Sequence, residues 1–456
     1  MTKTVNEREI VLAVLMEVTE NGMYSHVILR DVLAKYQYLE KKERAFITRV
    51  TEGTLENMIE IDYILDQFSK VKVKKMKPVI RNILRSAVYQ MKYMDSVPDR
   101  AVCSEAVKLA VRRGFSGLKG YVNGVLRSIA RGLDSIEYPA DEVQRLSVKY
   151  SCPEWIVQMW QKAYSRDVVE TMLGSFRGER PLTIRCCLNR ATPEELVEEL
   201  EKEGVTAVRH PYLPYAFEIK GYDYLESLES FRKGLFCVQD VSSMLVGELS
   251  RPVSGAQVID VCAAPGGKAL HVAEQLSVMA ADSGEPQGSV EARDLTEYKT
   301  GLIRENIERS GLSNIKAVCQ DACVPVEEDR GRGDLVIADL PCSGLGVLGR
   351  KADLKYRASK EGIRELAALQ RKILSCVQEY VKTGGTLMYS TCTVSLAENE
   401  ENVRWFLEKY PEFELDDIRD MVCPELRDSV SEEGWLQLLP GVHKCDGFFI
   451  ARLVRR

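Results

Sequence analysis

At 456 residues the chain is long enough for two or three domains. A composition of 45% hydrophobic and 29% charged residues is typical of a soluble globular protein, and no apolar run approaches the roughly 18 residues of a membrane span. The net charge of −6 argues against a nucleic-acid partner, but the charge is unevenly distributed: residues 1–150 carry +6 and the remainder carries −12. This asymmetry indicates a polyanion contact in the first third.

The cysteines and histidines favour a cytoplasmic protein without a metal. The 13 cysteines are scattered, none forms a CxxC pair, and there are only four histidines, so we expect no metal site. The first apolar run, Ile10 to Met16, is flanked by glutamates and is not a signal peptide. Thiols in a chain without a targeting signal are typical of a reducing cytosol.

The first third predicts a helical domain. From Val5 to about Ala140, Leu, Ile, Val and Ala recur at three- and four-residue spacing, as on the buried faces of helices. Turn signals divide this stretch at Asn21-Gly22, Lys77-Pro78, Val97-Pro98 and Arg113-Gly114. Five or more helices around one core are the simplest interpretation.

Basic residues gather in two groups within this helical third. The denser group contains Lys70, Lys72, Lys74, Lys75, Lys77, Arg81 and Arg85, and the second contains Arg112, Arg113, Lys119, Arg127 and Arg131. Two interpretations are open: a solvated helical surface, or a phosphate-binding surface whose affinity would fall with added salt.

A small α+β module is predicted next, after a linker at 138–140. Residues 141–175 have helical patterns, and strands are expected over 182–188, 205–209 and 216–219. Thr192 is the expected cap of a helix that runs to Lys202, with Pro193 at its first position and Glu195 closing a capping box. We find no chemistry in this module.

The last half begins with a loop suited to binding a cofactor. A buried strand over 258–262 leads into Ala263-Ala264-Pro265-Gly266-Gly267-Lys268 and then into a helix. Small residues allow a ligand to approach the backbone, and a helix start offers free N–H groups. The loop matches neither GxxxxGK[ST] nor GxGxxG.

Acidic residues follow the next three predicted strands. Asp294 comes after the strand over 289–292, Asp321 after the strand over 315–320, and Asp339 directly after Leu335-Val336-Ile337-Ala338. Asp294 lies 27 residues past Gly267, close to the spacing at which an acidic residue binds a ribose. Any one of them could be a helix cap, but together they suit a nucleoside.

Two cysteines stand just past the ends of two probable buried strands. Cys342 lies in Asp339-Leu340-Pro341-Cys342-Ser343-Gly344, and Cys392 lies in Tyr389-Ser390-Thr391-Cys392-Thr393, 50 positions later. Because the carboxyl ends of parallel strands meet at one crevice, the two thiols could face one pocket.

These motifs carry a resemblance to a known family. The matching segments are 234–243, 262–268, 339–344, 384–387, 390–393, 398–400 and 446–451. Residues 230–456 resemble the RsmB/NOP family of S-adenosylmethionine-dependent RNA 5-methylcytosine methyltransferases. The helical front resembles NusB-like RNA-binding domains in 8–15, 44–46, 84–90, 99–102, 105–107 and 121–127. Glu291 and Arg293 depart from the family's usual apolar neighbours before the acidic residue of the second strand.

The resemblance implies a role for each site residue. Cys392 would be the nucleophile that adds to C6 of cytosine, Cys342 would help proton removal and product release, and Asp339 would contact the base and the cofactor. The expected S-adenosylmethionine-binding residues are Cys262, Ala263, Ala264, Pro265, Gly266, Gly267, Lys268, Asp294, Asp321 and Asp339. The ammonium of Lys268 would also favour a thiolate.

The implied architecture is multidomain. It comprises an all-α NusB-like domain (1–140), a small α+β linker or RNA-binding module (141–230) and an α/β, Rossmann-like, seven-stranded class I methyltransferase domain (231–456). We expect a monomer that binds 16S ribosomal RNA, with no DNA or membrane partner. A last basic group, Arg350, Lys351, Lys355 and Arg357, would hold phosphates or form a mobile surface loop.

Other functions stay open at this stage. A tRNA cytosine-C5 methyltransferase and a non-catalytic RNA-binding ribosome-assembly factor are the alternatives. A DNA cytosine methyltransferase, which uses the Pro-Cys cysteine as nucleophile, would find an imitation of its Glu-Asn-Val motif at 401–403 but would leave Thr391-Cys392 unexplained. An exocyclic-amine methyltransferase would require Asn or Asp followed by Pro-Pro and an aromatic residue, where this chain has Asp-Leu-Pro-Cys.

Overall fold

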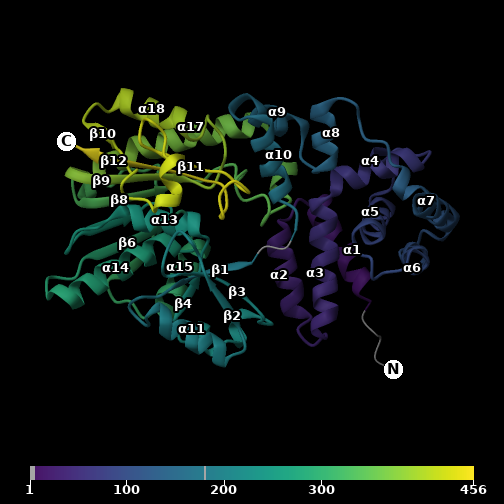
Figure 1. Ribbon diagram of the computed structural model, residues 1–456, viewed down its shortest axis with the longest axis horizontal. Coiled ribbons are helices and arrows are strands. Elements are labelled where there is room, and N and C mark those ends of the chain that lie inside the picture. Colours follow the sequence, from purple (N-terminus) through teal and green to yellow (C-terminus); the bar gives the residue numbers. More distant parts are fainter. Residues whose placement is uncertain (1–5, 179–180) are drawn as a thin grey trace. The chain divides into compact units, whose positions relative to one another are not determined.

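The computed structural model describes residues 6–178 and 181–456 (Figure 1). Val5, where the predicted helical stretch begins, lies outside the described residues. Among the described helices, none combines the length and the apolar character needed to cross a membrane.

The chain forms two compact units. The first contains the residues through Arg177 together with a later segment, Leu348–Arg357. The second contains Gly178–Val347 and Ala358–Arg456. The finer three-part division predicted from the sequence, with boundaries after residues 140 and 230, stays a prediction.

The first unit is built from helices, as predicted. They are α1 (Glu7–Thr19), α2 (Ser25–Lys35), α3 (Lys41–Glu56), α4 (Met58–Phe68), α5 (Pro78–Tyr93), α6 (Asp99–Arg112), α7 (Lys119–Gly132), α8 (Glu142–Lys149), α9 (Glu154–Ala163), α10 (Arg166–Ser175) and α16 (Leu354–Arg357). The predicted turn signals separate them: Pro78 is the first residue of α5, and Pro98 precedes α6. The apolar faces of α1 to α7 share one core, in which Leu15, Ile47 and Leu84 are fully buried.

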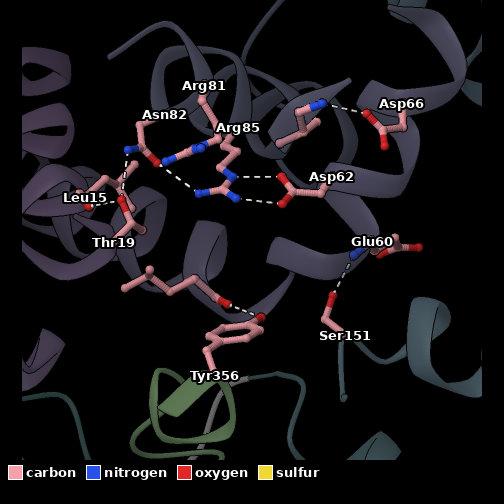
Figure 2. A network of polar contacts seen from close by, with 12 residues as sticks. Leu15, Thr19, Glu60, Asp62, Asp66, Arg81, Asn82, Arg85, Ser151 and Tyr356 are labelled. Atoms are coloured by element: carbon pink, nitrogen blue, oxygen red, sulfur yellow. Dashed lines mark hydrogen bonds and ion pairs between the residues drawn. The ribbon is translucent and has the colours of Figure 1, made fainter. Parts of the chain in front are cut away.

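An ion pair made by a buried arginine of this unit corrects one expectation about the basic residues. Arg85 donates from Nε and Nη2 to the two carboxylate oxygens of Asp62 at 2.7 and 2.6 Å, and from Nη1 to Asn82 (Figure 2). Arg81 is paired with Glu20 at 2.6 Å. A guanidinium in such a two-pronged pair has little capacity left for a phosphate. Arg85 therefore belongs to the fold of the helical unit and not to its surface charge.

Side chains of the segment Leu348–Arg357 donate hydrogen bonds to the C-terminal end of α3. Tyr356 donates its hydroxyl to the carbonyl of Leu55 at 2.7 Å (Figure 2), and Lys355 donates from Nζ to the carbonyl of Glu56 at 2.7 Å. The last carbonyls of a helix have no partner within the helix, so these side chains satisfy groups that would otherwise lack one.

The expectation that this segment holds phosphates is wrong for two of its cations. Lys355 is buried, and burial lowers its pKa to about 8. Arg357 donates to the carbonyls of Gly22 and Met23 and pairs with Asp353 at 3.2 Å. The segment is held in place by the helical unit, so it is not a loose surface loop.

The second unit contains a four-stranded antiparallel sheet of order β2-β3-β1-β4. Its elements are β1 (Leu182–Cys186), α11 (Pro193–Lys202), β2 (Thr206–Arg209), β3 (Ala216–Lys220), α12 (Glu229–Arg232) and β4 (Phe236–Val238). The predicted capping box of α11 is confirmed, since Thr192 and Glu195 each accept a hydrogen bond from the other's backbone N–H.

The larger sheet of this unit has the order β10-β12-β9-β8-β5-β6-β7, with β11 paired to β12. Its strands are β5 (Gln257–Asp260), β6 (Ser289–Asp294), β7 (Ile315–Cys319), β8 (Gly333–Asp339), β9 (Val381–Thr391), β10 (Phe413–Asp416), β11 (Leu436–Leu438) and β12 (Phe448–Arg455). The strands from β9 through β8, β5 and β6 to β7 are parallel, and β12 is antiparallel to β9 and β10.

Helices cover both faces of this sheet (Figure 1). They are α13 (Val241–Ser250), α14 (Gly267–Ser283), α15 (Glu297–Ser310), α17 (Lys360–Val377) and α18 (Glu400–Lys409). Leu335 and Ile337 of β8 pack into the core that contains residues of α13 and α14, whereas Val336 and Ala338 pack into the core of α17 and α18. Alternate residues of a strand point to opposite faces, so a strand buried on both sides has the continuous apolar run seen in the sequence.

The link between Tyr356 and α3 predicts a measurable loss of stability. Tyr356→Phe removes only the hydroxyl and leaves the carbonyl of Leu55 without that donor, which should cost about 1 kcal/mol. Urea unfolding of the full chain, followed by tryptophan fluorescence, measures the change. Tyr38→Phe is the matched control, because Tyr38 is a 71% exposed tyrosine of the same unit. Equal midpoints for the two variants would contradict the assignment.

Candidate active site

The strand order reverses between β5 and β8. The chain passes from β5 through β6 to β7 in one direction, and β8 then pairs with the other side of β5. In an open α/β sheet, ligands bind outside the carboxyl ends of the strands at the point where the order reverses. The loop after β5 and the end of β8 border this point.

The loop after β5 has the form expected of a cofactor loop. It runs from Cys262 to Lys268 and enters α14 at Gly267. Gly266 has φ = +111°, in the left-handed region that favours glycine. Within the described chain, no side chain caps the start of α14. Its first N–H groups and positive dipole end therefore suit a polar or anionic ligand group.

Asp294 and Asp321 stand at the same edge of the sheet as this loop. Asp294 is buried, accepts from the backbone N–H of Ala264 at 3.0 Å and pairs with Lys299 at 3.0 Å. Asp321 is exposed after β7 and accepts from the backbone N–H of Cys323 at 2.8 Å. The structure thus brings Asp294 beside the loop, whose shape it helps to hold, and leaves Asp321 at the end of β7, two strands away from β5.

Asp260 is a site residue that the sequence analysis missed. It ends β5 with no exposed surface, and its Oδ2 has no hydrogen-bond partner among the described residues. Burial, followed by the charge of Asp339, raises its pKa to about 8. A carboxylate at the end of an apolar strand was the available signal. Its orphaned oxygen and the free N–H groups of the uncapped helix start together fit a ligand that carries both donor and acceptor groups.

Lys268 connects the cofactor loop to the end of β8. Its Nζ lies 2.7 Å from Oδ2 of Asp339, and Ser390 donates to Oδ1 of the same carboxylate at 2.7 Å. Burial lowers the pKa of Lys268, but the charges of Asp339, Asp260 and Cys392 together raise it above its ordinary value. The lysine therefore stays an ammonium among acidic groups.

The two predicted cysteines meet. Parallel strands β8 and β9 pair with Asp339 opposite Ser390, and the sulfur atoms of Cys342 and Cys392 lie 3.1 Å apart. The hydrogen bond with Cys392, then burial, then the charges of Cys392, Glu398 and Asp339 raise the pKa of the Cys342 thiol. Two sulfur atoms at this distance can share one proton.

A buried polar scaffold supports the cysteine loops, and no role was predicted for its members. Gln370 donates to the carbonyl of Pro341 at 2.8 Å and to Glu398 at 3.2 Å, and Asn402 donates to Gln370 at 2.8 Å. Asn402 also accepts from Arg371 at 2.7 Å. The segment that imitates a DNA methyltransferase motif therefore contributes a structural amide. A polar residue on an amphipathic helix gives no sequence signal for this use.

The described residues contain no group of three or more His, Cys, Asp or Glu side chains arranged to hold a metal ion. A Rossmann-like sheet with an antiparallel strand beyond β9, a glycine turn after β5 and acidic strand ends defines a class I methyltransferase domain.

Three family descriptions match successive parts of the chain. Residues 5–131 match the NusB family, residues 152–222 match a ferredoxin-like domain described as RsmF/B-like, and residues 248–454 match "16S rRNA methyltransferase RsmB/F".

Similar proteins cover the whole chain. A Bacillus subtilis protein described as "Probable ribosomal RNA small subunit methyltransferase B" is 36% identical, and one from Cronobacter sakazakii described as "Ribosomal RNA small subunit methyltransferase B" is 29% identical; each alignment covers 100% of both chains. The crystal structure of PH0851 matches with a TM-score of 0.82 and 26% identity over 100% of both chains. The chain belongs to the RsmB/F family of 16S rRNA methyltransferases.

The buried carboxyl of Asp260 predicts a pH-dependent effect on stability. Its pKa is 3.8 in an ordinary setting and about 8 in the fold, so its favourable contribution is complete below pH 3.8 and is lost as the pH rises towards 8. Asp260→Asn copies the neutral form. We expect the variant to be more stable than the parent by a few kcal/mol at pH 8, at about 1.4 kcal/mol for each pKa unit.

Thermal unfolding of both proteins between pH 4 and 9 tests this expectation. The difference should widen up to about pH 8 and then stay constant. Asp282→Asn, at an exposed position of α14, is the control. A difference between Asp260→Asn and the parent that does not vary with pH would show that the buried carboxyl does not titrate as described.

Proposed function

We propose that this protein transfers a methyl group from S-adenosylmethionine to C5 of a cytosine in 16S ribosomal RNA, through a covalent bond between Cys392 and C6. The observation that supports the proposal most strongly is the pair of thiols 3.1 Å apart at the ends of β8 and β9, next to the ion pair of Lys268 and Asp339. The names of the full-length relatives favour small-subunit ribosomal RNA as the substrate.

The thiol pair suits a demanding methylation. C5 of cytosine is a poor nucleophile, so an enzyme must first activate the ring. Addition of the Cys392 thiolate to C6 converts the ring into an enamine in which C5 is nucleophilic. Lys268 is a fixed ammonium whose pKa responds to charge on Cys392, so it also stabilises that thiolate. Asp339 is proposed to contact the base near N3.

The edge formed by β5, β6 and β7 is proposed to hold the cofactor. The loop from Cys262 to Lys268 would lie against it, and Asp294 and Asp321 would bind its nucleoside hydroxyl and amine donors. When bound, S-adenosylmethionine would supply a methyl group that C5 takes as the sulfonium S–CH3 bond breaks, leaving a neutral thioether. The uncapped start of α14 and the orphaned Oδ2 of Asp260 support this placement.

The helical unit is proposed to bind the RNA backbone, because it is the basic part of an acidic chain. A base inside a helix cannot be reached, so we expect the target cytosine to be unpaired or turned out of its stack. Lys70, Lys72, Lys74, Lys75 and Lys77 are all exposed, as a phosphate-binding group requires. The match to the NusB family covers this region.

Replacing each cysteine separately tests the proposed function. The substrate is 16S rRNA from a strain that lacks the gene, incubated with methyl-labelled S-adenosylmethionine and analysed by bisulfite sequencing. Cys392→Ala should reduce methyl transfer by roughly three orders of magnitude or more and form no protein–RNA adduct. Cys342→Ala should accumulate an adduct that survives denaturing electrophoresis, because release fails.

Cys376→Ala is the control, since Cys376 is a partly buried cysteine of α17 that donates to the carbonyl of Cys323. An adduct lost in Cys342→Ala but kept in Cys392→Ala would reverse the two roles. Methylation of tRNA alone would favour the tRNA alternative. Failure to bind S-adenosylmethionine in calorimetry would favour the non-catalytic assembly factor.

Neutralising the lysine group should weaken RNA binding and its dependence on salt. We expect the slope of log affinity against log salt to become less steep by about 2 when Lys70, Lys74 and Lys75 are replaced together by Ala. Each phosphate contact on single-stranded nucleic acid contributes roughly 0.7 to this slope. Fluorescence anisotropy with a labelled 16S rRNA fragment measures the slope. A triple replacement of Lys41, Lys42 and Lys108, three exposed lysines outside this group, should change it much less. Equal effects would contradict a localised site.

A further inference from the structure

Glu398 accepts two hydrogen bonds from Ser343, the residue that follows Cys342. It is fully buried, and both of its carboxylate oxygens accept hydrogen bonds from Ser343: Oε1 from the backbone N–H at 2.8 Å and Oε2 from the hydroxyl at 2.5 Å. Gln370 donates to Oε1 at 3.2 Å. Burial raises the pKa of Glu398, and these hydrogen bonds oppose that rise. Because every one of these partners donates, the pocket is built for the ionised carboxylate.

The same contact joins the two cysteine loops to each other. Ser343 lies 2.7 Å from the hydroxyl of Thr393, the residue after Cys392. The backbone N–H of Leu345 also donates to the hydroxyl of Thr393 at 3.3 Å. Glu398 therefore fixes Ser343, which follows Cys342 and contacts Thr393, the residue after Cys392. Loss of Glu398 should therefore affect both cysteines.

The charges around the thiol pair are mostly negative. The groups that act on Cys342 are Cys392, Glu398 and Asp339, and each of them raises the pKa of the Cys342 thiol. The cation on this side is Lys268, which is paired with Asp339 and also feels the charge of Cys392. The two thiols therefore differ in surroundings: Glu398 acts on Cys342, and Lys268 faces Cys392.

We propose that Glu398 is a positioning residue that decides which thiol carries the shared proton. Its carboxylate holds the loop at Ser343 and keeps the proton on Cys342, which leaves the negative charge on Cys392. This inference rests on the proposed function, since it assigns the nucleophile and the releasing thiol of the same site.

The assignment gives Cys342 a defined task in product release. After methyl transfer, C5 loses its proton to water, the electrons of that C–H bond restore the C5–C6 double bond, and the C6–S bond breaks. The electron pair of that bond goes to the sulfur of Cys392. The S–H of Cys342 donates a hydrogen bond to this departing thiolate. The site then returns to its starting state, with one proton and one negative charge on the pair.

Two substitutions separate the charge of Glu398 from its shape. Glu398→Gln removes the charge and keeps an acceptor for the N–H of Ser343, whereas Glu398→Asp keeps the charge on a shorter side chain. Glu401→Gln is the matched control, since Glu401 is an exposed glutamate three residues later in the chain, in α18. Circular dichroism and thermal unfolding establish that each variant is folded.

The first measurement needs no RNA. The protein is alkylated with iodoacetamide across a pH series, and mass spectrometry follows the Cys342 and Cys392 peptides separately. In Glu398→Gln the pH midpoint for Cys342 should fall by about one unit, as expected when a nearby negative charge is removed. Glu398→Asp and Glu401→Gln should keep the parent midpoint. An unchanged midpoint in folded Glu398→Gln, or an equal shift in Glu398→Asp, would overturn the inference.

The second measurement follows single-turnover reactions on 16S rRNA. Glu398→Gln should form the covalent adduct but release it about tenfold more slowly or worse, within the range for loss of a proton-donating group. Release at the parent rate would overturn the inference. If the parent itself forms no adduct, and Cys342→Ala forms none either, the proposed function fails. The alkylation midpoints then still decide whether Glu398 controls the proton on Cys342.

Discussion

The candidate active site depends on the parallel pairing of two buried strands. Asp339 at the end of β8 is opposite Ser390 near the end of β9. Cys342 lies three residues beyond the first, and Cys392 lies two residues beyond the second. Parallel strands end at the same edge, and side chains alternate between faces, so a shift of one residue in register would move one sulfur away from the other. The two-sided core around β8 and β9 fixes that register.

The described acidic groups at this edge of the sheet outnumber the positive charges beside them. Asp260, Asp339 and two thiols gather around one ammonium, that of Lys268. Not all of these acids can be ionised together in a site with little water, so burial raises the pKa of Asp260 and that of Cys342. The protonation state of each group is therefore a property of the cluster. Glu398 belongs to the same set of groups, since its charge also raises the pKa of the Cys342 thiol.

Elements with a local sequence pattern were predicted from the sequence, whereas side-chain pairs between residues far apart in the chain were missed. The buried strands, the glycine turn and the cap at Thr192 each had a local pattern, and each lies where expected. Arg85 was grouped with surface lysines because its partner, Asp62, is 23 residues away and sets no pattern in the sequence. Lys355 was assigned to phosphate binding for the same reason, because its partner, the carbonyl of Glu56 in α3, lies 299 positions earlier in the chain.

The geometry of the cysteines is fixed before the chain leaves the second unit. Gly346 donates to the carbonyl of Cys392 at 3.2 Å and accepts from the N–H of Gly447 at 2.9 Å. A Cβ at Gly346 would lie 2.0 Å from the carbonyl oxygen of Gly447, so only glycine fits between these two backbones. Val347 is the last residue before the segment that joins the helical unit. The second unit therefore sets the distance between the thiols with its own backbone.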